Sequence, residues 1–351
     1  MMFHRRSGTL DAELTAMNEC MPHYYRITQG HGQGAELLMN AEAAFMQGNF
    51  SDAQILLEQT YSTIASNGQH NISLCCDFLA ARLSLFQEGV TFVKNPEVKR
   101  KELLSLHNMM WLNIFDSTYA YYYALIRMPE KIPALFKDHM LSTVSFLSPC
   151  RPMMEMIENQ VFLSQKMYAK VIGRSETLLP VCEKMHYELV SLHIQIQTAA
   201  AYAMLGKHHD ARQLLQKALE HAMPDGFLIP FVENYNYIKD VLGSINSITP
   251  EPFTDRILSL GSVYEQHCLR LSSRNSRPEI LNMLNSREAE IAALITDRLS
   301  NREIAERLFL SEGTVKQYVN QIYSKLMING DTRTKRKQLA ELISSINKSL
   351  T

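Results

Sequence analysis

Apolar residues recur every three or four positions along most of this chain, which is the spacing of an amphipathic helix. Alternating runs of Val, Ile and Thr are few, and no Asn-Gly or Asp-Gly pair stands between two such runs. The pattern predicts an all-α protein. It breaks in RLSSRNSRPEI (270–280), which is rich in Ser, Asn, Arg and Pro. We therefore expect a body over 1–270, a linker over 271–280 and a second domain over 281–351.

Two stretches of the body share one layout: AEAAFMQGNFSDAQILLEQ (41–59) and AAAYAMLGKHHDARQLLQKALE (199–220). In each, Gly ends a helix, a ring two positions later fills the gap between helices, and Ala five positions after the Gly allows close approach. The matched residues are Gly48, Phe50 and Ala53 in the first stretch and Gly206, His208 and Ala211 in the second. A weaker copy places Tyr168 and Val171 in the ring and small-residue positions.

Turns are then predicted near 48, 89, 127, 166 and 206, a period of about 40 residues. This spacing resembles tetratricopeptide repeats, and it predicts a solenoid of helical hairpins. An irregular helical bundle is the alternative. In a solenoid, a ligand is expected in the groove where successive first helices meet, and the aromatic and Met-rich character of residues 109–128 is the reason for expecting it. For the aromatic run at 117–126, packing in the core and between helices is the default interpretation, and a ligand-lined groove is the alternative.

The second domain begins with three helix-start signals in quick succession. Asn285 with Glu288 and Ser300 with Glu303 have capping-box spacing, and Ser311 can cap a third helix. The predicted helices are about 286–297, 301–308 and 312–326. Only three residues separate the second from the third, which predicts a tight helix-turn-helix with Ala305 and Val315 at the crossing.

The third helix of this unit has two unlike faces. Its apolar stripe holds Val315, Val319, Ile322 and Leu326, which are suited to a core. The opposite stripe is polar, with one Lys and no carboxylate, and consists of Gly313, Lys316, Gln317, Asn320 and Ser324. Side-chain amides and Lys can read base edges in the major groove of DNA, so this stripe predicts a DNA-reading face. Helical corners of similar shape also occur in proteins that do not bind DNA.

The stretch LNSREAEIAALITDRLSNREIAERLFLSEGTVKQYVNQIYSKL resembles the C-terminal DNA-binding domain of the LuxR family of bacterial transcription factors. The resemblance covers about 60 residues. It implies double-stranded DNA as a partner, with base contacts from Lys316, Gln317 and Asn320 and phosphate contacts from Thr314 and its neighbours. The other expected DNA-contacting residues are Ser311, Tyr318 and Asn301.

Three residues depart from the family pattern. Arg298 and Met327 stand where the family usually has Gly, and Tyr318 stands where it has His. The family also implies a homodimer on DNA, formed by a fourth helix with Leu339, Leu342, Ile343 and Ile346 on one face. The alternative is that this helix only covers the three-helix core.

Helical repeats ahead of such a domain, with ALEHAMPDGFLIPFVE (218–233), resemble the repeat region of MalT-like regulators. In that family the repeats bind an inducer and an upstream NTPase module drives assembly. This chain has no Walker A motif, so it is a short relative or the C-terminal part of a longer regulator, and no cofactor is expected. The expected function is a sequence-specific transcriptional regulator with a small-molecule inducer or partner protein on its repeat groove. A protein–protein interaction scaffold with weak or vestigial DNA binding is the alternative.

Charge and residue chemistry change this picture little. Residues 277–351 hold 12 Lys+Arg and 9 Asp+Glu, about +3, and the other residues hold 23 and 27, about −4. A mildly basic unit permits a polyanion partner. No residue pattern supports catalysis, the six Cys show no metal-ligand spacing, and no window is apolar enough for a membrane span. We therefore expect a cytoplasmic protein that is not an enzyme and holds no metal.

Overall fold

The computed structural model describes residues 4–348 apart from 66–68, 88, 91, 93–95, 145, 147, 276–283, 327 and 329, and apart from the side chains of 148, 273–275, 332–333 and 343–348. Its regular elements within these residues are helices, as the apolar spacing predicts. The chain divides into two compact units, 1–269 and 270–351, which are described separately. Of the expected linker, 271–275 continue a helix of the first unit, and 276–280 lie outside the described residues.

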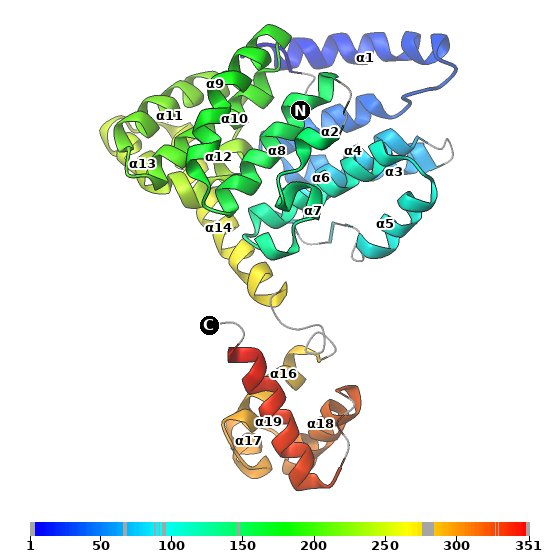
Figure 1. Cartoon of the computed structure of the whole chain (residues 1–351), viewed down its shortest axis with the longest axis vertical. Helices are drawn as coiled ribbons and strands as arrows, with labels where there is room; N and C mark the ends of the chain where they lie inside the picture. Colours follow the sequence, from blue (N-terminus) through cyan, green and yellow to red (C-terminus); the bar gives the residue numbers. More distant parts are fainter. Residues whose placement is uncertain are drawn as a thin grey trace. The chain divides into compact units, whose positions relative to one another are not determined.

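The first unit, the body, is built from hairpins of antiparallel helices (Figure 1). Short 3-10 turns lie at Pro129–Lys131, Leu141–Thr143, Ser148–Cys150 and Met223–Asp225. The α-helices are α1 (Leu10–Ile27), α2 (Ala35–Met46), α3 (Phe50–Ala65), α4 (His70–Leu83), α5 (Pro96–Ser105), α6 (Met109–Leu125), α7 (Ala134–Lys137), α8 (Arg151–Ser164), α9 (Tyr168–Met185), α10 (Glu188–Met204), α11 (His208–Ala222), α12 (Ile229–Glu233), α13 (Tyr235–Ile248) and α14 (Pro252–Asn275).

Residues with left-handed backbone follow the even-numbered helices α2 to α10 at a regular interval. They are Gly48 (φ 81°), Gly89 (φ 87°), Arg127 (φ 58°), Lys166 (φ 61°) and Gly206 (φ 75°). These are the five turn positions that the sequence predicts. A positive φ ends a helix because it turns the chain out of the helical path. The hairpin is therefore a repeated unit of about 40 residues, while its likeness to tetratricopeptide repeats stays a prediction.

The ring predicted to fill each hairpin does so in the first copy. Phe50 lies 6.1 Å from Phe45 and 4.8 Å from Phe86, measured between ring centroids. In the later copy the prediction is wrong, because His208 at the start of α11 is exposed to solvent. An imidazole keeps its hydrogen bonds to water in that position, whereas a benzyl ring gains free energy by leaving water.

The short helix α12 occupies the side of the body that α2, α4 and α6 face. Glu233 of α12 is buried and pairs with the buried Arg82 of α4, at 2.7 Å from Nε and 3.0 Å from Nη2. The Tyr121 hydroxyl of α6 donates to the same carboxylate at 2.8 Å. The Leu228 amide donates to the Met46 carbonyl of α2 at 2.8 Å. These contacts hold α12 against three inner helices.

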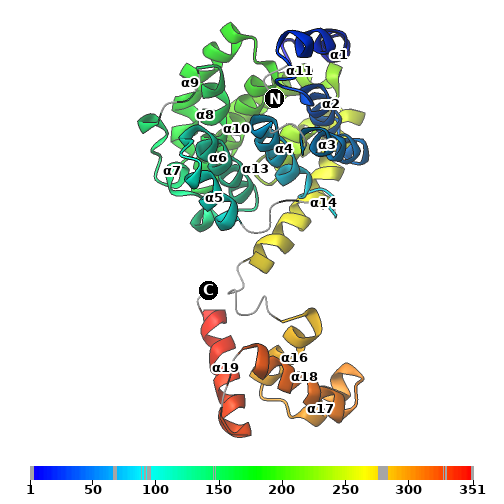
Figure 2. The same cartoon turned by 90° about the vertical axis from the view of Figure 1, so that its right-hand side faces the viewer.

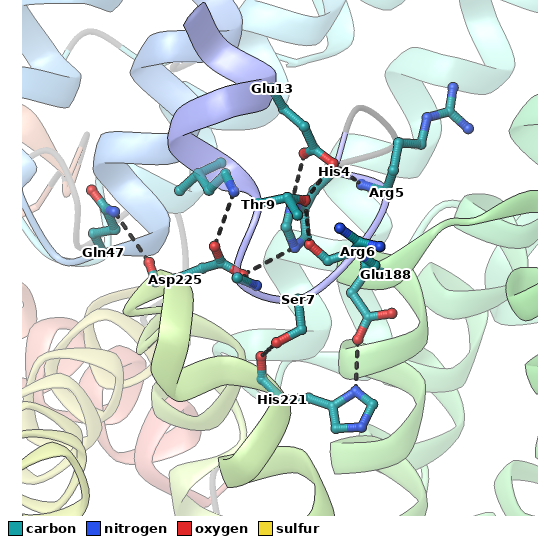
Figure 3. Close-up of polar contacts among 12 residues, drawn as sticks. His4, Arg5, Arg6, Ser7, Thr9, Glu13, Gln47, Glu188, His221 and Asp225 are labelled. Carbon is teal, nitrogen blue, oxygen red and sulfur yellow. Dashed lines mark hydrogen bonds and ion pairs between the residues drawn. The ribbon is translucent and has the colours of Figure 1, made fainter.

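The N-terminal segment 4–10 is fixed to the turn that follows α11 (Figure 3). The His4 ring is fully buried, with Nδ1 2.8 Å from Glu13 Oε2 and Nε2 3.3 Å from Asp225 Oδ2. The Asp225 carboxylate also accepts from the amides of Gly8 at 2.6 Å and Leu10 at 3.0 Å. Figures 1 and 2 show α1, which follows this segment, next to α2. The N-terminal segment and the turn after α11 are thus joined.

Within its described residues, the second unit holds four helices around one core. They are α16 (Ser286–Thr296), α17 (Asn301–Leu308), α18 (Glu312–Lys325) and α19 (Thr332–Lys348). Both α18 and α19 pack against α16, and α17 packs against α18. The core consists of Leu284, Ile291, Ala292, Leu294, Ile295, Ile304, Ala305, Val315, Val319, Ile322, Tyr323, Leu326, Ile328 and Leu339. Because this core is separate from that of the body, the unit has its own basis for stability.

Candidate nucleic-acid interface

Side-chain caps set the start of the first three helices in the second unit. Asn285 and Glu288 form a reciprocal capping box on α16, and Ser300 and Glu303 form another on α17. The Ser311 hydroxyl accepts from the Thr314 amide at 3.0 Å and caps α18. All three predicted caps are confirmed. They satisfy amides that the first helical turn leaves without partners, so the helix boundaries are fixed locally.

The connection between α17 and α18 is a tight turn. Phe309 takes a φ of 55°, and the Leu310 amide donates to the Ala305 carbonyl at 2.9 Å. Ala305 is 5% exposed and Val315 is fully buried, as expected for a small residue and a β-branched one at a helix crossing. The residues therefore form the helix-turn-helix that their spacing predicts.

The two faces of α18 differ in exposure as well as in chemistry. Its apolar residues Val315, Val319 and Ile322 are buried in the core. The residues on the opposite side are exposed, namely Gly313, Lys316, Gln317, Asn320 and Ser324. Two amides and one ammonium group are thus presented on one face of a helix, with the core on the other. This geometry suits the major groove, which admits one α-helix.

Two hydroxyls lie at the N-terminal end of α18. Besides the cap, Ser311 Oγ lies 2.7 Å from Thr314 Oγ1, and Thr314 is half-buried. Hydroxyls and amides at a helix N-terminus are favourable groups for phosphate, although in this structure they bond to each other. Tyr318 is half-buried and packs against the core, so its ring is partly withdrawn from the polar face.

Asn301, at the start of α17, is held by a residue that the sequence analysis missed. The Arg336 guanidinium of α19 donates to Asn301 Oδ1 at 2.9 Å and also to the Leu299 carbonyl. Arg336 therefore fixes the amide of Asn301 and brings a positive charge to the start of α17. No local signal in the sequence pairs two residues 35 positions apart.

A second missed contact joins the start of α16 to the end of α18. Lys325 Nζ lies 2.7 Å from Glu288 Oε2, and the Glu288 side chain is only 2% exposed. Burial acts to raise the pKa of the Glu288 carboxyl, but Lys325 and the Asn285 amide outweigh it and hold that pKa below its usual range. Lys325 therefore neutralises a buried carboxylate, and Lys316 is the Lys of α18 that lies on the polar face.

The fourth helix, α19, carries the residues predicted to form the dimer contact, and this contact stays a prediction. Leu339 is fully buried in the core of its own unit, and Leu342 packs partly against the same core. An apolar stripe does not show whether it covers its own domain or a partner, and here Leu339 covers its own domain. The side chains of Ile343 and Ile346 lie outside the described residues.

Arg298 replaces a family Gly at a position where the backbone is left-handed, with φ 65°. Glycine adopts this conformation readily, whereas a side chain makes it unfavourable by about 1–2 kcal/mol. The substitution therefore leaves the turn between α16 and α17 intact but strained. Met327, the other departure at a turn, lies outside the described residues.

Comparison with known proteins assigns this unit. Residues 282–336 match the family of bacterial regulatory proteins described as the luxR family. The transcriptional regulatory protein LnrK of Bacillus subtilis is 32% identical over 122 residues, which are 34% of this chain and 54% of LnrK. The transcriptional regulatory protein DegU of Brevibacillus brevis is 45% identical over 53 residues, 15% of this chain and 22% of DegU. The DNA-binding transcriptional activator DevR/DosR of Mycobacterium tuberculosis is 35% identical over 57 residues, 16% of this chain and 26% of that protein.

These likenesses cover only part of each protein. The chain spans about half the length of LnrK and about a quarter of the other two relatives. No solved structure matched the chain. Among the described helices, none is long and apolar enough to cross a membrane.

Proposed function

We propose that this chain is a transcriptional regulator that binds specific double-stranded DNA through α18. The proposal starts from its C-terminal unit, which is a LuxR-family helix-turn-helix domain. The observation that carries the proposal is the exposed polar face of α18, set on a capped and packed three-helix base. Gln317 and Asn320 read base edges, and Lys316 contacts guanine or a nearby phosphate. Ser311, Thr314, Tyr318 and Asn301 contact the DNA backbone around them.

The rest of the proposal concerns assembly and regulation. The regulator binds as a homodimer on a two-fold site, since dimers of helix-turn-helix proteins bind paired half-sites. The helical body binds a small molecule or a partner protein that changes DNA binding. The names of the relatives, which are transcriptional regulatory proteins, agree with this proposal.

The test begins with selection of bound sequences from a random pool of double-stranded DNA. A two-fold symmetric site is expected, and a site without symmetry would contradict the dimer. Affinity is then measured on the selected site and on a scrambled site at several salt concentrations. Absence of any preferred sequence would contradict the proposal and favour the interaction scaffold.

Single substitutions on α18 separate base reading from phosphate contact. Gln317→Ala or Asn320→Ala should weaken binding to the selected site by about 1–3 kcal/mol and relax one base position. Lys316→Ala should lower the log–log salt slope by about 1 if it contacts phosphate. Ser324→Ala is the matched control, because Ser324 lies on the same exposed face but far from the helix N-terminus. If Gln317→Ala and Asn320→Ala behave like the control, the face is only solvated.

A further inference from the structure

Four successive inner helices of the body enclose a cavity of about 160 Å³. Leu38 of α2, Phe78 of α4, Ile114 of α6 and Met154 of α8 each contribute a side chain to its wall. These helices are the first helices of consecutive hairpins, so the cavity is a product of their stacking. Of the aromatic and Met-rich run at 109–128, most rings pack into the core and only part of one helix face reaches the cavity.

Among the residues that the structure describes, the wall of the cavity is apolar over most of its area and includes no Lys, Arg or His. The carboxylate of Glu42 also lies on this wall. The Ser117 hydroxyl already donates to the Ile114 carbonyl at 2.6 Å, so it adds little polarity. An anionic molecule would meet the Glu42 carboxylate there, whereas an uncharged apolar molecule would bury its surface without loss of hydrogen bonds.

The size of the cavity limits the ligand further. Apolar protein cavities of about 150 Å³ accept benzene. A volume of about 160 Å³ therefore suits one small ring. Cys75 lines the cavity and its side chain is exposed, so the interior is reached from solvent.

The Cys150 thiol on the cavity wall favours reversible binding. Partial burial raises the pKa of this thiol. It is therefore protonated at neutral pH, and the thiol is a much weaker nucleophile than the thiolate. It forms, together with Cys75, a small and polarisable part of an apolar wall.

One wall residue connects the cavity to the buried ion pair that holds α12. The ring of Phe78 lies 5.5 Å from the Tyr121 ring and 5.5 Å from the guanidinium carbon of Arg82. Arg82 in turn pairs with Glu233 of α12. A molecule in the cavity thus packs on the same ring that supports this ion pair, and filling the cavity adds contacts to the folded body.

We propose that this cavity between α2, α4, α6 and α8 is the effector site of the body and takes a small, uncharged apolar molecule the size of one aromatic ring. The inference rests on the proposed function only in that an effector changes DNA binding. Binding of the molecule to the cavity is itself measured without DNA. Failure to bind the molecule and failure to bind DNA are therefore distinguishable.

The test uses the full chain with benzene and toluene as probes and benzoate as the charged comparator. At ten times the dissociation constant, an occupied site should raise the Tm of the body by about 3 °C. It should also slow alkylation of Cys75 by N-ethylmaleimide about tenfold, because only about one site in eleven is empty. Cys20, an exposed thiol of α1, is the internal control and should react at an unchanged rate.

Two variants test whether the probes bind in this cavity. Cys75→Phe fills the cavity from an exposed position and should weaken benzene binding at least tenfold, whereas the matched Cys20→Phe should not. Met153→Ala removes a half-buried wall residue and should raise the affinity for naphthalene relative to benzene. The proposal is overturned if neither uncharged probe protects Cys75 at millimolar concentration, if benzoate binds as well as benzene, or if neither variant changes affinity.

Discussion

Replacing Glu233 by Gln tests whether the buried ion pair with Arg82 holds the body together. Both side chains are at most 1% exposed, and three rings surround the guanidinium at 4.9 to 5.7 Å. The carboxylate accepts two hydrogen bonds from Arg82 and one from Tyr121. Glu233→Gln keeps the shape but leaves a buried cation without its counter-charge.

The expected cost follows from that loss. Removing one partner of a buried pair destabilises a protein by about 3–5 kcal/mol, which is a large part of the usual 5–15 kcal/mol. The matched control is Glu265→Gln. Glu265 also bonds two cations, Arg127 and Lys239, but its side chain is 20% exposed. Ion pairs near the surface contribute at most about 1 kcal/mol, so this control should change the free energy of unfolding little.

Urea unfolding followed by tryptophan fluorescence measures the body alone, because Trp111 of α6 is the one Trp of the chain. The slope of free energy against urea must match that of the wild type for the comparison to hold. Adding Arg82→Met to Glu233→Gln removes the unpaired charge and should recover part of the loss. The reasoning fails if Glu233→Gln costs no more than Glu265→Gln, or if the double variant is less stable than the single one.

Three further predictions concern the C-terminal unit. Arg298→Gly should stabilise it by up to about 1 kcal/mol, since relief of the positive φ exceeds the added freedom of the unfolded chain, and thermal melting followed by circular dichroism measures this. Because its pKa is lowered in the folded unit, the Glu288 carboxylate stabilises the unit at neutral pH, and this stability is lost as pH falls through that pKa. Glu288→Gln should therefore make the free energy of unfolding less dependent on pH on the acid side, which urea titrations at several pH values measure. A fragment of residues 277–351 should fold and keep the base preference of the full chain with marginal stability; a disordered circular dichroism spectrum would contradict this.

Local patterns in the sequence predict the elements whose causes are local. The caps at Asn285, Ser300 and Ser311 depend on residues three positions away, and the turns at Gly48 and Gly206 depend on single backbone conformations. The periodic spacing of apolar residues then predicts which face of α18 is buried. Fold class and the polar face could therefore be predicted from sequence.

Contacts between distant residues could not be predicted in this way. Arg82 and Glu233 are 151 positions apart, and each alone resembles an ordinary surface charge in the sequence. In the sequence, Lys325 does not differ from a Lys that faces DNA, because nothing local shows that it pairs with Glu288. The apolar position of Leu339 shows that it leaves water but does not show which surface covers it. In each case the missing information is the identity of the neighbour in space.

The contact between the N-terminal segment and the turn after α11 has a consequence for how the chain folds during synthesis. Gly8 and Asp225 are 217 residues apart, so the N-terminal segment is synthesised before Asp225 and cannot form this hydrogen bond while the intervening helices are made. At about 5–20 residues per second, this interval is roughly 10–45 s on the ribosome. During it, the surfaces of the first hairpin that will cover α12 have no α12 to contact. The early helices are therefore exposed to chaperones and to aggregation during this interval, and their packing is completed only when the turn after α11 and the helix α12 have emerged.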